Sequence, residues 1–184
     1  MRTFLDKLHD LKLKEVAQRQ KVISEKCLRI RAESLDCPAE FRTALLRAPN
    51  EAISLITEVK SKAPGRKNVE NLDPEEVVRD YVSGGAKAIS VLTDENWFGG
   101  SLETLEIVRK ATVLPLLHKE FIITPYQLLE GRLRGASAAL ILTYYFQQAE
   151  LRKIIATAKT IGLEVVLECS LENELPRALA VNPD

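Results

Sequence analysis

Five short apolar segments recur along this chain, and polar or charged residues follow each of them. They are Ile53–Thr57, Ala88–Leu92, Val113–Leu117, Ala138–Leu142 and Leu163–Leu167. Strands buried on both faces of a parallel sheet have continuous rather than alternating apolar residues. From the second segment onward the spacing is about 25 residues, enough for one strand, one helix and two short loops. The pattern therefore predicts an α/β fold in which parallel strands alternate with helices.

Helix signals fill the intervals between these segments. Asp73-Pro74-Glu75-Glu76 and Thr124-Pro125-Tyr126-Gln127 each combine an N-cap, a proline at the first helical position and a Glu or Gln at the third. Ser101 and Ser170 are further N-cap candidates. Phe98-Gly99-Gly100 lacks the spacing of a phosphate-binding loop, so we expect a tight turn before Ser101. The expected helices cover residues 74–84, 101–111, 125–134, 147–160 and 171–180.

The first fifty residues have a different pattern. Apolar residues at helical spacing among many lysines predict one long amphipathic helix; they are Phe4, Leu5, Leu8, Leu11, Val16, Val22 and Ile23. A second short helix is expected over Ala39–Arg47, after a break at Pro38. We expect residues 1–50 to form a helical extension docked on residues 51–184, which hold the strands. A helix that binds a partner is the alternative.

Composition narrows the class of protein. In 184 residues, Lys plus Arg and Asp plus Glu both total 26, which disfavours nucleic acid or an anionic membrane as a partner. No apolar stretch is long enough to predict a membrane helix. Cys27, Cys37 and Cys169 are odd in number and lack metal-ligand spacing, so we expect free thiols in a reducing compartment, the cytoplasm.

Charged side chains gather at the predicted carboxyl ends of the strands, where barrel enzymes place their chemistry. Glu58 and Lys60 are two residues apart and so share a face of the first strand. We expect them to pair, either to hold a charged substrate or as a structural ion pair. Lys119 shares a face with Leu117, and a lysine directed into an apolar barrel mouth is suited to acid catalysis. Glu168, at the end of the fifth strand, is a candidate acid–base partner for Lys119.

The neighbouring residues suggest simpler roles. His118 has the opposite parity to Lys119 on the third strand, so we expect it to face the helices as a hydrogen-bonded core histidine. Trp97, Phe98 and Phe121 follow strand ends, where an aromatic ring can stack on a planar ligand. Packing within the protein is an equal alternative for each of these rings.

Several of these segments together resemble one family. Ile56-Thr57-Glu58-Val59-Lys60, Ser90-Val91-Leu92-Thr93-Asp94-Glu95, Phe98-Gly99-Gly100-Ser101 and Lys119-Glu120-Phe121-Ile122 are similar to indole-3-glycerol-phosphate synthase. The likeness runs from Leu5-Asp6-Lys7 to Asp184. It implies a (β/α)8 TIM-barrel fold, here with about five βα units and an N-terminal helical extension. It also implies tryptophan biosynthesis, a small phosphosugar substrate and no cofactor or metal.

The resemblance implies roles for the candidate residues. Lys119 resembles the general acid of ring closure, and Glu168 its acid–base partner in the dehydration. Lys60 is then expected to hold the negative groups of the substrate, oriented by Glu58. Phe98, Phe121 and Leu140 are expected to line the pocket for the anthranilate ring. Ala63-Pro64-Gly65 departs from the serine-proline-serine that is usual in the family.

The length of the chain, 184 residues, leaves two alternatives to an active synthase. Barrels of this type have about 250 residues, so we expect strands one to five only, an open sheet edge and weak or absent turnover. The first alternative is a catalytically inactive scaffold that self-associates through this open edge. The second is a different phosphosugar enzyme on the same scaffold, because a fold does not determine one function.

Overall fold

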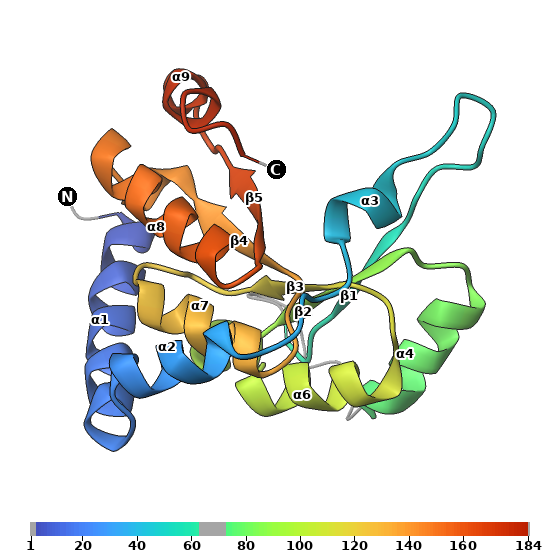
Figure 1. Cartoon of the computed structure of the whole chain (residues 1–184), viewed down its shortest axis with the longest axis horizontal. Helices are drawn as coiled ribbons and strands as arrows, with labels where there is room; N and C mark the ends of the chain where they lie inside the picture. The colour runs from blue at the N-terminus through green and yellow to red at the C-terminus, as the bar shows by residue number, and fades with distance from the viewer. Residues whose placement is uncertain (1–2, 63–72, 184) are drawn as a thin grey trace.

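The computed structural model of the chain describes residues 3–62 and 73–183. One parallel sheet forms its centre, with the strand order β1-β2-β3-β4-β5 (Figure 1). The strands are β1 Ile56–Val59, β2 Ala88–Leu92, β3 Leu116–Lys119, β4 Ala138–Leu142 and β5 Glu164–Glu168. Each strand pairs with the next in sequence, whereas a doubly wound sheet reverses its strand order at a switch point. The sheet is therefore part of a (β/α) barrel, as predicted.

The apolar pattern placed the starts of three strands too early, β5 Glu164–Glu168 by one residue and two others by three. β1 starts at Ile56 and β3 at Leu116, three residues later than the predicted starts at Ile53 and Val113. Ile53 is 77% exposed and Val113 is 87% exposed, so these apolar residues precede the sheet without entering it. As a consequence Glu58 lies within β1, and Lys119 is the last residue of β3 rather than a residue beyond it.

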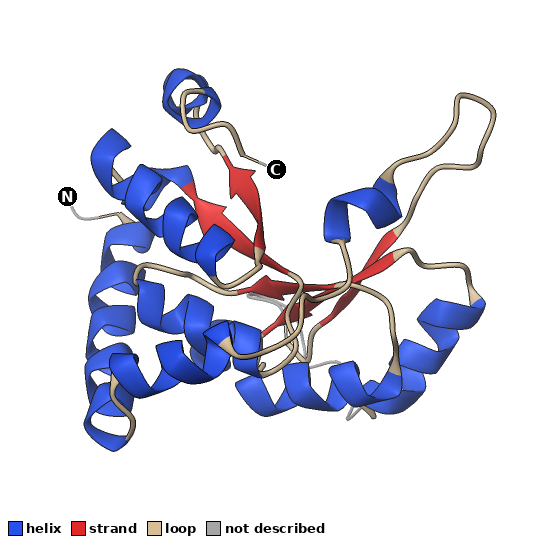
Figure 2. Cartoon of the chain, viewed as in Figure 1, coloured by secondary structure: helices blue, strands red, loops and turns tan. Residues whose placement is uncertain are grey.

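Helices between the strands cover one face of the sheet (Figure 2). They are α4 Pro74–Ser83, α6 Leu102–Ala111, α7 Pro125–Leu133 and α8 Gln148–Thr160. Asp73 and Ser101 accept N-cap hydrogen bonds, and Thr124 with Gln127 forms a capping box. Gly99 adopts φ +64° after the short helix α5 Glu95–Phe98, which produces the tight turn expected before Ser101.

The last predicted helix is divided in two. A 3-10 turn, η2 Glu172–Glu174, precedes α9 Leu175–Leu179, where a single helix over residues 171–180 was expected. Ser170 does not cap it; its backbone N–H donates to Oε2 of Glu174 at 2.8 Å. The Glu174 side chain is buried, so it stabilises this turn from within and the helix begins only afterwards. Another short 3-10 turn, η1 Thr143–Tyr145, follows β4.

Three helices precede the sheet. α1 Phe4–Val22 is the predicted long helix, but α2 Glu25–Glu33 is a separate helix that Ser24 caps and that the apolar pattern did not reveal. α2 packs on α7, where Oη of Tyr126 donates to the carbonyl of Ile23 at 3.0 Å. α3 Phe41–Leu45 lies on the side of the sheet opposite α4 and α6 (Figure 1).

The two faces of the sheet contribute to two hydrophobic clusters. The outer face packs against the helices through residues such as Val59, Ile89, Val91, Leu116 and Ile141. The inner face carries a smaller cluster, which Phe41 of α3 covers; its strand members are Ala88, Leu117, Ala138, Leu140 and Leu142. Because side chains alternate along a strand, residues in step with this second set point toward the barrel interior.

Candidate active site

Glu58 lies between two lysines on the inner face of the sheet. Its Oε2 is 2.5 Å from Nζ of Lys119, and its Oε1 is 2.7 Å from Nζ of Lys60. Glu58 pairs in register with Ser90, and Ser90 with Leu117, so Lys119 stands two residues further along the same face. The predicted pairing of Glu58 with Lys60 is confirmed. The contact of Glu58 with Lys119 depends on the strand order, because only β2 lies between β1 and β3.

The two lysines keep Glu58 ionised. Partial burial by itself raises the pKa of Glu58, but the hydrogen bonds from Lys119 and Lys60 outweigh it and the pKa is lowered. The group thus combines two ammonium ions with one carboxylate and has an excess of positive charge. Lys119 is not in the apolar surroundings that were expected: its side chain is 36% exposed and bound to a carboxylate.

Two aromatic rings lie close to each other at the carboxyl end of the sheet. The ring centroids of Phe98 and Phe121 are 6.2 Å apart, with an interplanar angle of 35°. Phe98 ends α5, whereas Phe121 follows β3 and packs against the inner cluster that contains Leu140. The three residues predicted to line an anthranilate pocket are therefore associated with the same face of the sheet.

Glu168 makes no contact with this group in the described structure. It ends β5 opposite Leu142 and two residues after Val166, which packs on the inner cluster, so it shares the face of Lys119. Its side chain is exposed and forms no ion pair or hydrogen bond within residues 3–62 and 73–183. The carboxylate in contact with Lys119 is Glu58 and not Glu168.

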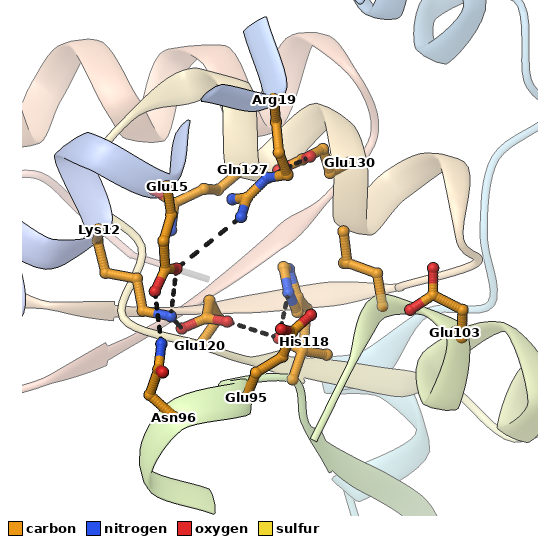
Figure 3. A pocket seen from close by; sticks show the side chains of 12 residues that line it. Lys12, Glu15, Arg19, Glu95, Asn96, Glu103, His118, Glu120, Gln127 and Glu130 are labelled. Atoms are coloured by element: carbon orange, nitrogen blue, oxygen red, sulfur yellow. Dashed lines mark hydrogen bonds and ion pairs between the residues drawn. The ribbon is translucent and has the colours of Figure 1, made fainter. Parts of the chain in front are cut away.

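A buried ion cluster that was not predicted from the sequence lies between α1 and the residues that follow β2 and β3 (Figure 3). Nζ of Lys12 in α1 is 2.8 Å from Asp94, 2.9 Å from Glu15 and 3.2 Å from Glu120. Burial by itself would lower the pKa of Lys12. The three carboxylates raise this pKa by more than burial lowers it, so the net shift is upward and the ammonium stays charged. One signal was present: Lys12 occupies the position between the buried residues Leu8 and Val16, four residues from each.

The same cluster borders a cavity of about 280 Å³ between α1 and the sheet. Arg19 closes one side through an ion pair of 2.8 Å with Glu130, and Asn96 donates to Glu15 at 2.7 Å. Figure 3 shows Lys12, Glu15 and Arg19 extending from α1 toward Glu120 and Glu130. The N-terminal helix is thus attached to the strand ends by charged groups as well as by apolar packing.

His118 has the surroundings of a core histidine. It is 1% exposed, and its Nε2 lies 2.9 Å from Oγ1 of Thr93. Burial, assisted by the charges of Arg19 and Lys12, lowers the pKa of His118 to about 3. The ring is therefore neutral near pH 7 and cannot act there as a charged acid, which agrees with the expected structural role.

This pKa predicts an acid-dependent loss of stability. Between the ordinary histidine pKa of about 6.5 and about 3, the unfolded chain binds a proton at His118 that the folded chain does not. The free energy of unfolding therefore falls as the pH is lowered through this range, by up to about 1.4 kcal/mol per pH unit from this residue. The free energy of unfolding, measured by urea denaturation between about pH 4 and about pH 6, should change less steeply with pH for His118→Gln than for the unsubstituted chain. Substitution of the half-exposed His9 by Gln is the control, and equal slopes for all three proteins would contradict the assignment.

The described residues contain neither a membrane-spanning helix nor a metal-binding group of side chains. Within residues 3–62 and 73–183 no helix is long and apolar enough to cross a membrane. In the same ranges no three His, Cys, Asp or Glu side chains are grouped so that they hold a metal ion. The substituted Ala63-Pro64-Gly65 segment lies outside the described residues.

The chain is similar to known proteins over nearly all of its length. The family model for indole-3-glycerol phosphate synthase matches residues 5–184. An indole-3-glycerol phosphate synthase of Mycolicibacterium gilvum is 38% identical over 178 residues, covering 96% of this chain and 64% of the relative. One of Carboxydothermus hydrogenoformans is 38% identical over 181 residues, covering 96% of this chain and 69% of the relative. The chain thus spans about two thirds of the length of these relatives.

Among solved structures, a mandelate oxidase chain aligns with a TM-score of 0.49 and 18% identity, over 60% of this chain and 44% of that chain. The match to the family model extends over nearly all of the sequence, and the relatives that bear the same name are well above 30% identical. The chain belongs to the indole-3-glycerol phosphate synthase family.

Proposed function

We propose that the chain takes part in the indole-3-glycerol phosphate synthase reaction of tryptophan biosynthesis. In this reaction 1-(2-carboxyphenylamino)-1-deoxyribulose 5-phosphate closes its second ring and is converted to indole-3-glycerol phosphate, carbon dioxide and water. Membership of the family supports the proposal. The observation that carries it is the contact of Glu58 with both Lys119 and Lys60, at the end of the sheet where the rings of Phe98 and Phe121 also meet.

In the proposed mechanism Lys119 is the general acid. The new carbon–carbon bond forms between the ring carbon that bears the carboxylate and the ribulose carbonyl carbon, whose oxygen receives a proton from Lys119. Loss of carbon dioxide then leaves an electron pair that the adjacent iminium nitrogen accepts. In the dehydration the resulting hydroxyl takes up a second proton and leaves as water, while the methylene carbon next to the nitrogen loses a proton, which completes the indole ring. The chemistry needs a proton donor at the carbonyl oxygen, and an ammonium held 2.5 Å from a carboxylate supplies one.

The remaining residues bind and orient the substrate. The ammonium of Lys60 attracts the negative groups of the substrate, and Glu58 holds both lysines in place. Phe98 and Phe121, together with Leu140 of β4, form the surface for the anthranilate ring. Glu168 lies on the same face without a protein partner in the described structure, and its free carboxylate is available to take up the proton released in the dehydration.

Turnover of the anilino-ribulose phosphate tests this function. The chain is assayed alone and mixed with a polypeptide that supplies the part of the Mycolicibacterium gilvum relative not covered by the alignment. Formation of indole-3-glycerol phosphate, followed by its fluorescence, is expected to exceed the uncatalysed rate in at least one preparation. A rate equal to the uncatalysed background in both preparations would contradict the proposal.

Sedimentation of the same preparations addresses the alternative of an inactive, self-associating scaffold. β1 and β5 are the edge strands of the sheet, and pairing between the edges of two chains would make the sedimenting mass rise with protein concentration.

We place the protein in the cytoplasm because Cys27, Cys37 and Cys169 are free thiols, which fits a reducing compartment.

A further inference from the structure

We propose that Lys12 is a positioning residue for the anthranilate pocket, and that it holds Phe98 and Phe121 at their spacing through Asp94 and Glu120. This inference rests on the proposed function, because it concerns the site at which the aromatic ring of the substrate binds. Lys12 belongs to the N-terminal helix α1 and is only 2% exposed. It acts on the pocket through its carboxylate partners.

The first connection runs through Asp94. Oδ2 of Asp94 lies 2.8 Å from Nζ of Lys12. Oδ1 of the same carboxylate accepts hydrogen bonds from the backbone N–H of Trp97 at 2.6 Å and of Phe98 at 3.2 Å. These bonds cap the single turn of α5, which is too short to hold its own position. The place of the Phe98 backbone therefore depends on the orientation of Asp94, which the ion pair with Lys12 restrains.

The second connection runs through Glu120. Oε1 of Glu120 lies 3.2 Å from Nζ of Lys12 and also accepts the backbone N–H of Phe121 at 2.8 Å. Oε2 accepts a hydrogen bond from Oγ1 of Thr93 at 3.0 Å. Thus one oxygen atom meets both Lys12 and the amide of the second aromatic residue. Glu120 also follows Lys119 directly, so the same contact restrains the backbone next to the general acid.

One ammonium therefore joins the backbone supports of both rings. Asp94 follows β2 and Glu120 follows β3, and each is fixed to the amide of one phenylalanine. Without Lys12 the carboxylates of Asp94, Glu120 and Glu15 would face one another in a buried space, where like charges repel strongly. Relief of this repulsion moves the two loops apart and changes the distance between the rings. Displacements of about 1 Å near a reacting substrate can reduce rates by about a hundredfold.

The test compares Lys12→Met with Lys12→Arg and with Lys14→Met, a substitution of an exposed lysine on the same helix. Binding of anthranilate is followed by the fluorescence of Trp97, the single tryptophan, which precedes Phe98. Lys12→Met is expected to weaken anthranilate binding about tenfold or more. Lys12→Arg, which keeps the charge, should recover most of the affinity, and Lys14→Met should bind like the unsubstituted chain.

Amide hydrogen exchange provides a readout that a general loss of stability would not reproduce. Glu120→Gln weakens only the second connection, so it should accelerate exchange at Phe121 more than at Phe98. Lys12→Met should accelerate exchange at both amides. Equal acceleration at every amide of the sheet in either variant would show that the residue has a structural role only, and would overturn the proposal. If Lys12→Met does not fold, the exchange rates of Glu120→Gln still test the proposal.

The outcomes separate this inference from the proposed function. If anthranilate binds neither to the unsubstituted chain nor to its mixture with the complementary polypeptide, the pocket itself is wrongly assigned and both proposals fall. If that chain binds anthranilate and folded Lys12→Met binds it equally well, the role of Lys12 is wrong and the proposed function is unaffected.

Discussion

Replacement of Lys119 by methionine is expected to lower kcat about a thousandfold in any preparation of the chain that turns over the anilino-ribulose phosphate. Proton donation by a positioned general acid contributes roughly this factor. Methionine keeps the length of the side chain but cannot donate a proton to the carbonyl oxygen. Initial rates at saturating substrate measure the effect, because the loss should be in kcat rather than in KM.

The same substitution should leave the fold intact. Lys119 is 36% exposed, and Glu58 retains Lys60 at 2.7 Å after the substitution. Removal of such a partly exposed ion pair changes the free energy of unfolding by about 1 kcal/mol or less. Lys110→Met, at a 70% exposed lysine that pairs with Glu106, is the matched control and should keep the full rate. If Lys119→Met kept most of its activity, Lys119 would not be the general acid.

The second large effect is expected for stability, from Gly100→Ala. A Cβ atom at Gly100 would overlap the carbonyl oxygen of Leu92, and it would lie 2.6 Å from the carbonyl carbon of Leu92 and 2.9 Å from Cα of Thr93. These atoms belong to the backbone at the end of the buried strand β2, so no side-chain rotation relieves the overlap. We expect the free energy of unfolding to fall by about 3 kcal/mol or more, the upper range for overpacking.

Urea denaturation at neutral pH measures this loss. Gly84→Ala is the control, because Gly84 has an ordinary φ of −74° at the end of α4 and a Cβ atom there would meet nothing closer than 3.2 Å. Its stability should differ from that of the unsubstituted chain by about 1 kcal/mol or less. If Gly100→Ala were as stable as Gly84→Ala, the loop after α5 would have to move away from β2 without cost, contrary to the packing described.

Burial decides which strands have the bounds that the apolar pattern predicts. β2 and β4 occupy the predicted residues Ala88–Leu92 and Ala138–Leu142, because every position in them is buried and only apolar or small residues fit. The starts of β1 and β3 were misplaced because exposed Ile53 and Val113 extend the apolar runs beyond the sheet. An apolar run shows that a strand is present, whereas pairing with its neighbours decides where the strand starts.

The contacts in the site are also of two kinds, those that follow from local spacing and those that depend on the tertiary structure. The pairing of Glu58 with Lys60 follows from local geometry, since residues two apart share a face of a strand. The choice of Glu58 rather than Glu168 as the partner of Lys119 depends on strand order and register across β2. The cluster around Lys12 depends on how α1 docks, because its carboxylates come from segments far apart in the sequence.

The sequence by itself determined the class of fold, the family and the face of each strand that carries the candidate side chains. Periodicity, capping residues and local motifs are short-range properties, and the sequence contains them completely. Only the tertiary structure decided which charges meet. Contacts across strands and between α1 and the sheet join residues distant in the chain, and a buried lysine is stable only where several carboxylates converge on it.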